Sequence, residues 1–106
     1  MIVRSDLPPG HQATQATHVA LQFAVEHPEE VGPWHRESGY LVVLNAPYEY
    51  DVRLYADRAK ELGLAVSVFR EDDFGGEATA CAIAPGPAAR KLCSSLPLAL
   101  KEPAMV

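Results

Sequence analysis

The sequence predicts an α/β fold in which a four-stranded mixed sheet lies between two layers of helices. Short apolar or β-branched runs alternate with longer amphipathic segments, in the order strand, helix, strand, helix, strand, strand, helix. Helical connections make the first three strands parallel, whereas a short connection makes the fourth strand antiparallel to the third. The length suffices for one hydrophobic core, so we expect a single three-layer α/β/α domain over residues 1–106.

The composition is that of an ordinary folded protein, with 48% hydrophobic and 22% charged residues. No apolar run reaches the roughly 18 residues of a membrane span, and residues 1–10 lack a secretory signal, so we expect a cytoplasmic protein without membrane contact. The net charge of −5 argues against a general polyanion-binding protein, although a few local cations can hold phosphates. Cys81 and Cys93 lack metal-ligand spacing, and Cys81 is expected in the core.

The first strand is expected over residues 2–7, which end at a Pro-Pro-Gly turn. Because proline suits the first turn of a helix, a helix should begin near Pro9 or Gly10 and end at about Glu26. Alanines at spacings of three and four give it a small-residue face for the sheet. A polar stripe begins where free N–H groups favour an anion, and a merely solvated face is its alternative. The stripe comprises His11, Gln15, His18 and Gln22.

The middle of the chain predicts a short helix followed by a strand. A polar helix should run from Pro28 through Trp34 or Arg36, because acidic residues follow the proline. Trp34 is either a structural residue over the core or a stacking platform for a base. The continuous apolar run at residues 40–45 predicts a buried central strand.

A second long helix and two strands are expected next. Residues 49–62 have an apolar face at helical spacing, and Gly63 stops the helix. Residues 64–69 predict the third strand. An acidic, glycine-bearing loop at 70–77 leads to the fourth strand at 78–84.

The end of the chain predicts one more helix, at residues 88–96, which follows a Pro-Gly-Pro break. A tail at 97–106 should be ordered in part at Leu98 and Leu100 and frayed beyond them.

Two groups of polar residues follow parallel strands and should meet at one edge of the sheet, where ligands bind in open α/β folds. One group lies after the first strand and at the start of the first helix; the other is the 70–77 loop with Thr79. A histidine near a carboxylate can act as general acid or base, and a hydroxyl can position water. These residues suit hydrolysis. The alternatives are that Asp6 caps the helix and that the acidic loop is only a soluble turn.

Several motifs resemble those of the type-2 peptidyl-tRNA hydrolases. Residues 4–7 (RSDL) and 10–20 (GHQATQATHVA) are similar to the family's opening R-x-D-L and G-K-x-A-A-Q-x-x-H-A. The segments 42–47 (VVLNAP), 62–67 (LGLAVS) and 83–87 (IAPGP) resemble its later motifs. The match extends over nearly the whole chain in the same order, which makes it evidence of fold and ancestry.

The resemblance implies an enzyme that hydrolyses the ester between tRNA and a peptide or an N-blocked amino acid. It further implies peptidyl-tRNA as the RNA substrate, a homodimer, and no metal or organic cofactor. The alternative is a non-catalytic module on the same fold that binds RNA or a protein.

The motif match assigns roles to individual residues. The family's helix-start lysine falls on His11, a departure because lysine is charged at pH 7 whereas histidine is mostly neutral. The family's aspartate aligns with Glu71, or with Asp73 after a local shift, and Thr79 matches the family's threonine. The candidate catalytic residues are His11, Glu71, Asp73 and Thr79. The candidate substrate-binding residues are Arg4, Gln15, His18, Arg70, Arg90 and Lys91, and Arg36 is a further candidate for a phosphate contact.

Overall fold

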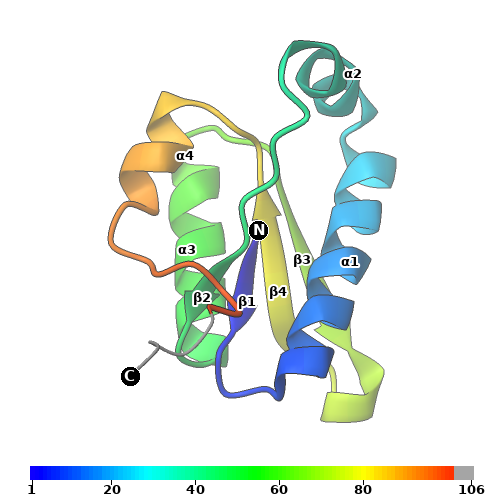
Figure 1. The fold of residues 1–106 in the computed structure, drawn as a ribbon, viewed down its shortest axis with the longest axis vertical. Coiled ribbons are helices and arrows are strands. Elements are labelled where there is room, and N and C mark those ends of the chain that lie inside the picture. The colour runs from blue at the N-terminus through cyan, green and yellow to red at the C-terminus, as the bar shows by residue number, and fades with distance from the viewer. Residues whose placement is uncertain (102–106) are drawn as a thin grey trace.

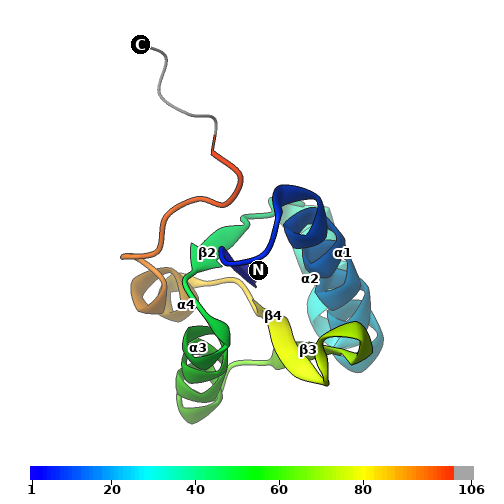
Figure 2. The same cartoon turned by 90° about the horizontal axis from the view of Figure 1, so that it is seen from below.

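The computed structural model describes residues 1–101, in which the sheet lies between two pairs of helices (Figure 1 and Figure 2). On one side are α1 (Pro9–Glu26) and α2 (Pro28–Glu37), and on the other are α3 (Glu49–Glu61) and α4 (Pro87–Leu92). The strands are β1 (Ile2–Arg4), β2 (Leu44–Ala46), β3 (Val66–Glu71) and β4 (Glu77–Ile83), with a 3-10 turn, η1 (Asp72–Phe74), before β4. The predicted α/β class and four-stranded mixed sheet are confirmed.

The strands lie in the order β2-β1-β4-β3. β1 pairs parallel with β2, and β4 is antiparallel to both β1 and β3, so the strand directions are as predicted. The placement of β4 between β1 and β3 was not predicted. The carboxyl ends of β1, β2 and β3 meet at one edge of the sheet, at the bottom of Figure 1. The start of α1 and η1 also lie at this edge, which is called the carboxyl edge below.

The core has two halves because successive residues of a strand face opposite sides. Ile2 and Cys81 pack on the α3 side, whereas Val3 and Ala80 pack on the α1 side. Cys81 is fully buried, as predicted, and burial raises the pKa of its thiol to about 12.

A β-bulge interrupts this alternation in β4. Ala80 lies opposite Phe69 and Ala78 opposite Arg70, so Thr79 is the extra residue. Because the next residue, Ala80, faces α1, strict alternation would turn the Thr79 side chain toward α3. Instead its hydroxyl contacts Gln15 of α1, on the same side as Ala80. The bulge therefore turns Thr79 toward the first helix, as bulges commonly redirect a side chain.

The prediction of a buried central strand at residues 40–45 was wrong. The strand β2 begins only at Leu44 and lies at the edge of the four-stranded sheet. Tyr40, Leu41 and Val42 are 82%, 64% and 52% exposed, in an extended connection from α2. Because β1 begins at Ile2, opposite Leu44, the partner strand is too short to pair with the earlier apolar residues.

Other helix and strand bounds differ from the predicted ones. β1 ends at Arg4 instead of residue 7, and α4 ends at Leu92 instead of residue 96. The expected loop at 70–77 is partly strand, because β3 extends to Glu71 and pairs it with Glu77. Residues 97–99 pair with residues 43–45 beside β2, and the rest of the predicted tail, 102–106, lies outside the described residues.

The polar stripe of α1 lies along β3, the open edge strand of the sheet. The Gln22 amide donates to the carbonyl of Val68 at 3.0 Å, and the His27 ring contacts the carbonyl of Val66 at 3.0 Å. These contacts satisfy backbone groups that an edge strand leaves unpaired. Gln22 is thus a structural contact and not simply part of a solvated face.

Candidate active site

A pocket of about 280 Å³ opens at the carboxyl edge between α1 and η1. Its α1 wall carries side chains at helical spacing, and its other wall comes from the end of β3 and from η1. The lining residues are His11, Thr14, Gln15, His18, Glu71, Asp73 and Phe74. Two separate stretches of the chain, predicted to meet at this edge, therefore form one hollow.

A chain of hydrogen bonds connects Thr79, Gln15 and Glu71 at the back of this pocket. The Thr79 hydroxyl donates to Gln15 Oε1 at 2.5 Å, and Gln15 Nε2 donates to Glu71 Oε2 at 3.0 Å. An ionised carboxylate can only accept, so Glu71 fixes the amide orientation, and the amide oxygen then requires Thr79 as donor. Gln15 is 4% exposed and Thr79 is fully buried, so Thr79 lies behind Gln15 and does not line the pocket.

Glu71 is the carboxylate that this arrangement stabilises. The hydrogen bond from Gln15, helped by the backbone N–H groups of Asp73 and Asp72, holds the pKa of Glu71 below its ordinary value. The carboxylate, which lines the pocket, therefore stays ionised to a lower pH than an ordinary glutamate. Asp73 lines the same pocket but is exposed, and its backbone N–H lies 3.5 Å from Glu71 Oε1.

Two imidazoles flank the carboxylate, and aromatic rings orient both. The His18 ring stacks on Phe69 with centroids 4.5 Å apart and an interplanar angle of 3°. The His11 ring lies 5.9 Å from that of Phe74, in a tilted arrangement. His11 stands in the first turn of α1, which has no side-chain cap and no acidic residue, so its N–H groups are open to a ligand.

Arg4 lies at the carboxyl edge, between two carboxylates. Its Nε and Nη2 bond both oxygens of Asp6, at 2.9 and 2.8 Å, and Nη1 bonds Glu77 at 2.9 Å. These contacts raise the pKa of Arg4, and the Arg4 hydrogen bond lowers the pKa of Asp6. Asp6 thus pairs with Arg4 and does not cap α1, whose first turn follows Pro8. The guanidinium joins the exit of β1 to the entry of β4.

We expect Arg4→Met to lower the free energy of unfolding by about 2 kcal/mol at pH 7, because Asp6 and Glu77 lose a shared cation. The folded pKa of Asp6 lies below its unfolded value, so the stabilisation exists above the unfolded pKa and disappears as the pH falls through the folded one. In urea denaturation, Arg4→Met should therefore lower the free energy of unfolding by less at about pH 2.5 than at pH 7. Arg58→Met, at an exposed position of α3, is the control, and an equal loss in both variants would contradict the role of Arg4.

The remaining predicted cations lie outside the pocket. Arg70 lies in β3 and lines a different hollow, on the α3 side of the sheet. Arg90 and Lys91 are in α4, and Arg36 is in α2. These two helices lie toward the end of the sheet opposite η1 (Figure 1). The structure thus brings together His11, Gln15, His18, Glu71 and Asp73, with Thr79 behind them.

Sequence reasoning missed three residues of this region, one of which is Phe74, whose ring lines the pocket beside His11. Thr14 lines the pocket, and its spacings of three from His11 and four from His18 placed it on the same helical face. Gln12 is 6% exposed and connects the carbonyl of Leu7 at 2.7 Å with the Asn45 side chain at 2.8 Å. No local pattern distinguished the buried Gln12 from a solvated glutamine.

The fold and site define a three-layer α/β protein with two carboxylates and two imidazoles around an open pocket at the carboxyl edge. The family model described as peptidyl-tRNA hydrolase PTH2 matches residues 1–98, and the chain belongs to this family. At the level of the family, the function is peptidyl-tRNA hydrolysis and the substrate class is peptidyl-tRNA. A comparison with curated protein sequences gives no match.

Two further properties concern residues 1–101. No helix in this range combines the length and apolarity that a membrane crossing needs. Within the same range, His, Cys, Asp and Glu side chains form no group of three or more suited to a metal ion.

Proposed function

We propose that this chain hydrolyses the ester joining tRNA to a peptide or an N-blocked amino acid, with the reaction at the His11–Glu71 pocket. The observation that carries the proposal is the ionised Glu71 carboxylate, held by Gln15 and Thr79 at the wall of an open pocket. Family membership supports the substrate class.

The reaction needs a positioned water and a group that accepts its proton. The water oxygen bonds to the ester carbonyl carbon and gives a proton to Glu71, whose Oε1 receives no hydrogen bond from Gln15. The bond from that carbon to the ribose oxygen then breaks, and the ribose oxygen takes up the proton. The products are the peptide acid and tRNA with a free hydroxyl. Because the ester is labile, orientation of the water supplies much of the required rate.

His11 supplies a donor at the mouth of the pocket. Together with the open N–H groups of the first turn of α1, its ring suits a terminal phosphate or the developing oxyanion. His18, held against Phe69, shapes the wall on which the acceptor end rests. Thr79 acts through Gln15, as a positioning residue, because its hydroxyl is buried behind that side chain. Glu71 is favoured over Asp73 as the general base because, of the two, only Glu71 accepts a hydrogen bond from Gln15.

The test is incubation of the purified protein with N-acetyl-aminoacyl-tRNA and measurement of released tRNA. Turnover above background is expected, and none over a range of salt and pH would refute hydrolysis of this substrate. His11→Ala should lower kcat/KM about tenfold or more, because a donor to charge in the site is lost. His35→Ala, at an exposed position of α2, should leave the rate unchanged.

The second candidate is a non-catalytic RNA- or protein-binding module on the same fold. The replacement of the family lysine by His11 is the observation that favours it. His11→Lys distinguishes the two functions: a binding module gains no turnover, whereas in a hydrolase the variant stays active because the family's charge is restored.

We also propose that the protein forms a homodimer. The exposed apolar side chains of Tyr40, Leu41 and Val42 offer a surface for a second copy. Light scattering at increasing protein concentration measures the mass and checks this.

A further inference from the structure

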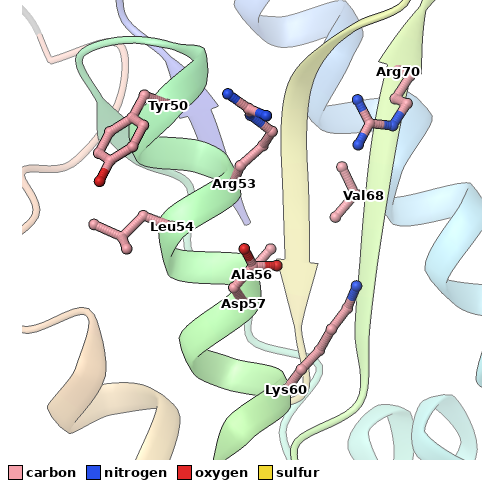
Figure 3. Close-up of a pocket in the computed structure, with 8 residues that line it drawn as sticks. All are labelled: Tyr50, Arg53, Leu54, Ala56, Asp57, Lys60, Val68 and Arg70. Carbon is pink, nitrogen blue, oxygen red and sulfur yellow. The ribbon is translucent and has the colours of Figure 1, made fainter.

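A second hollow, of about 530 Å³, lies between α3 and β3 on the opposite side of the sheet from the pocket (Figure 3). Arg53 and Lys60 reach into it from α3, and Arg70 reaches into it from β3. These are three of the nine Lys and Arg residues in a chain that has 14 acidic ones. We call the hollow the α3–β3 groove. Cations gathered in this way on an acidic protein indicate an anionic ligand.

The charge balance of the groove is positive after its acidic residues are counted. Asp57 is the one acidic residue that lines it, and Arg53 lies 3.7 Å from Glu49. Glu49 is also engaged by the backbone N–H of Ala78 at 2.7 Å. Among residues 1–101, Lys60 and Arg70 have no ion-pair partner within 4.0 Å. At least these two cations remain available to a ligand.

The length of the groove fits a run of phosphates better than a single one. Arg53 and Lys60 are two turns apart on one face of α3, which separates them by about 10 Å along the helix axis. Arg70 faces Arg53 from the other wall (Figure 3). A guanidinium group can donate two hydrogen bonds to two oxygens of one phosphate. Arg53 and Arg70 can therefore hold the same phosphate, while Lys60 contacts a phosphate further along the chain of the RNA.

The groove also supplies what the reaction pocket lacks. No Lys or Arg lines the His11–Glu71 pocket, whose charged groups include two carboxylates. An RNA substrate must therefore place most of its phosphates elsewhere. Arg70 and Glu71 are adjacent residues of β3, with side chains on opposite faces, and β3 is the edge strand. A polymer can leave the pocket, pass over this strand and enter the groove.

We infer that the α3–β3 groove binds the phosphate backbone of the tRNA whose acceptor end occupies the pocket. The inference rests on the proposed function for the identity of the RNA. It assigns phosphate contacts to Arg53 and Lys60 in addition to Arg70.

The test measures binding of deacylated tRNA, which has no ester, by fluorescence anisotropy at several salt concentrations. Each of Arg53→Gln, Lys60→Gln and Arg70→Gln should weaken binding about five- to eightfold at about 0.1 M salt, because log K falls with log salt by about 0.7 to 0.9 per phosphate contact. The triple variant should lose about two orders of magnitude. The salt slope should fall by about one for each cation removed.

The matched control is Arg58→Gln, which removes the same charge from α3 at an exposed position that does not line the groove. It should leave binding nearly unchanged. Asp57→Asn should tighten binding, because it removes the groove's acidic residue, whereas Glu61→Gln on the same helix should have little effect. Circular dichroism confirms folding, and Arg70→Lys, which keeps the charge, should retain most of the binding.

Equal weakening in Arg58→Gln and in the groove variants would overturn the inference in favour of net charge alone. AMP is the second probe: micromolar AMP binding that Arg70→Gln abolishes, with tRNA binding unchanged, would overturn it in favour of a mononucleotide site. Release of tRNA from N-acetyl-aminoacyl-tRNA is measured separately. If turnover is absent but the groove variants still lose tRNA binding, the hydrolase proposal fails and the groove inference stands. If turnover is present and the groove variants bind tRNA normally, the groove inference fails and the hydrolase proposal stands.

Discussion

Replacement of Thr79 by valine is expected to lower kcat for N-acetyl-aminoacyl-tRNA about a hundredfold, with little change in KM. Valine keeps the shape of threonine but has no hydroxyl to donate to Gln15 Oε1. Without that donor the buried amide is free to turn, and Glu71 loses the N–H that holds its carboxylate toward the pocket. The unpaired amide oxygen should also cost about 1 to 3 kcal/mol of stability, which thermal unfolding measures.

Three readouts separate this positioning role from a loss of folding. Thr79→Ser keeps the hydroxyl and should retain most of the activity. Thr17→Val removes a threonine hydroxyl from an exposed position of α1 and should be neutral. In Thr79→Val, the acidic limb of the pH–rate profile should move to higher pH, because loss of the Gln15 hydrogen bond lets the pKa of Glu71 rise toward its ordinary value. Wild-type kcat and an unmoved limb would contradict the role of Thr79.

Glu71→Gln is expected to reduce kcat/KM by about two to three orders of magnitude, because the amide cannot take a proton from water. In the wild type the Gln15 hydrogen bond lowers the pKa of Glu71, so the carboxylate stays ionised as the pH falls below the ordinary glutamate value of 4.5. The part of the rate that needs the carboxylate should disappear only as the pH falls through this lowered pKa. Measurement of kcat/KM from about pH 3 to pH 8 checks this for the free enzyme.

The companion variants decide between the two acids of the pocket. Asp73→Asn should have a much smaller effect, because Asp73 is exposed and receives no hydrogen bond from Gln15. Asp72→Asn, in η1 but outside the lining of the pocket, is the neutral control. A larger loss in Asp73→Asn than in Glu71→Gln would transfer the role of general base to Asp73.

Local sequence was sufficient where an element's pattern is complete within the element. The turn before Pro9, the alanine face and the proline after His27 determine α1, and its predicted bounds agree with the structure. The same reasoning failed at residues 40–43, because an apolar run predicts a buried strand only where a partner strand exists. The β1 strand has just three residues, and it offers no partner to Tyr40.

The candidate site shows the same division. The sequence by itself determined the family, the strand directions and the convergence of His11, Gln15 and Glu71 at one edge of the sheet. Only the tertiary structure decided that Thr79 lies behind Gln15 and that Arg70 faces a different hollow from its neighbour Glu71. The reason is physical. The bulge at Thr79 depends on how β4 pairs with β3, and the hydrogen bond from Thr79 to Gln15 joins residues 64 positions apart in the chain. No local pattern contains that information.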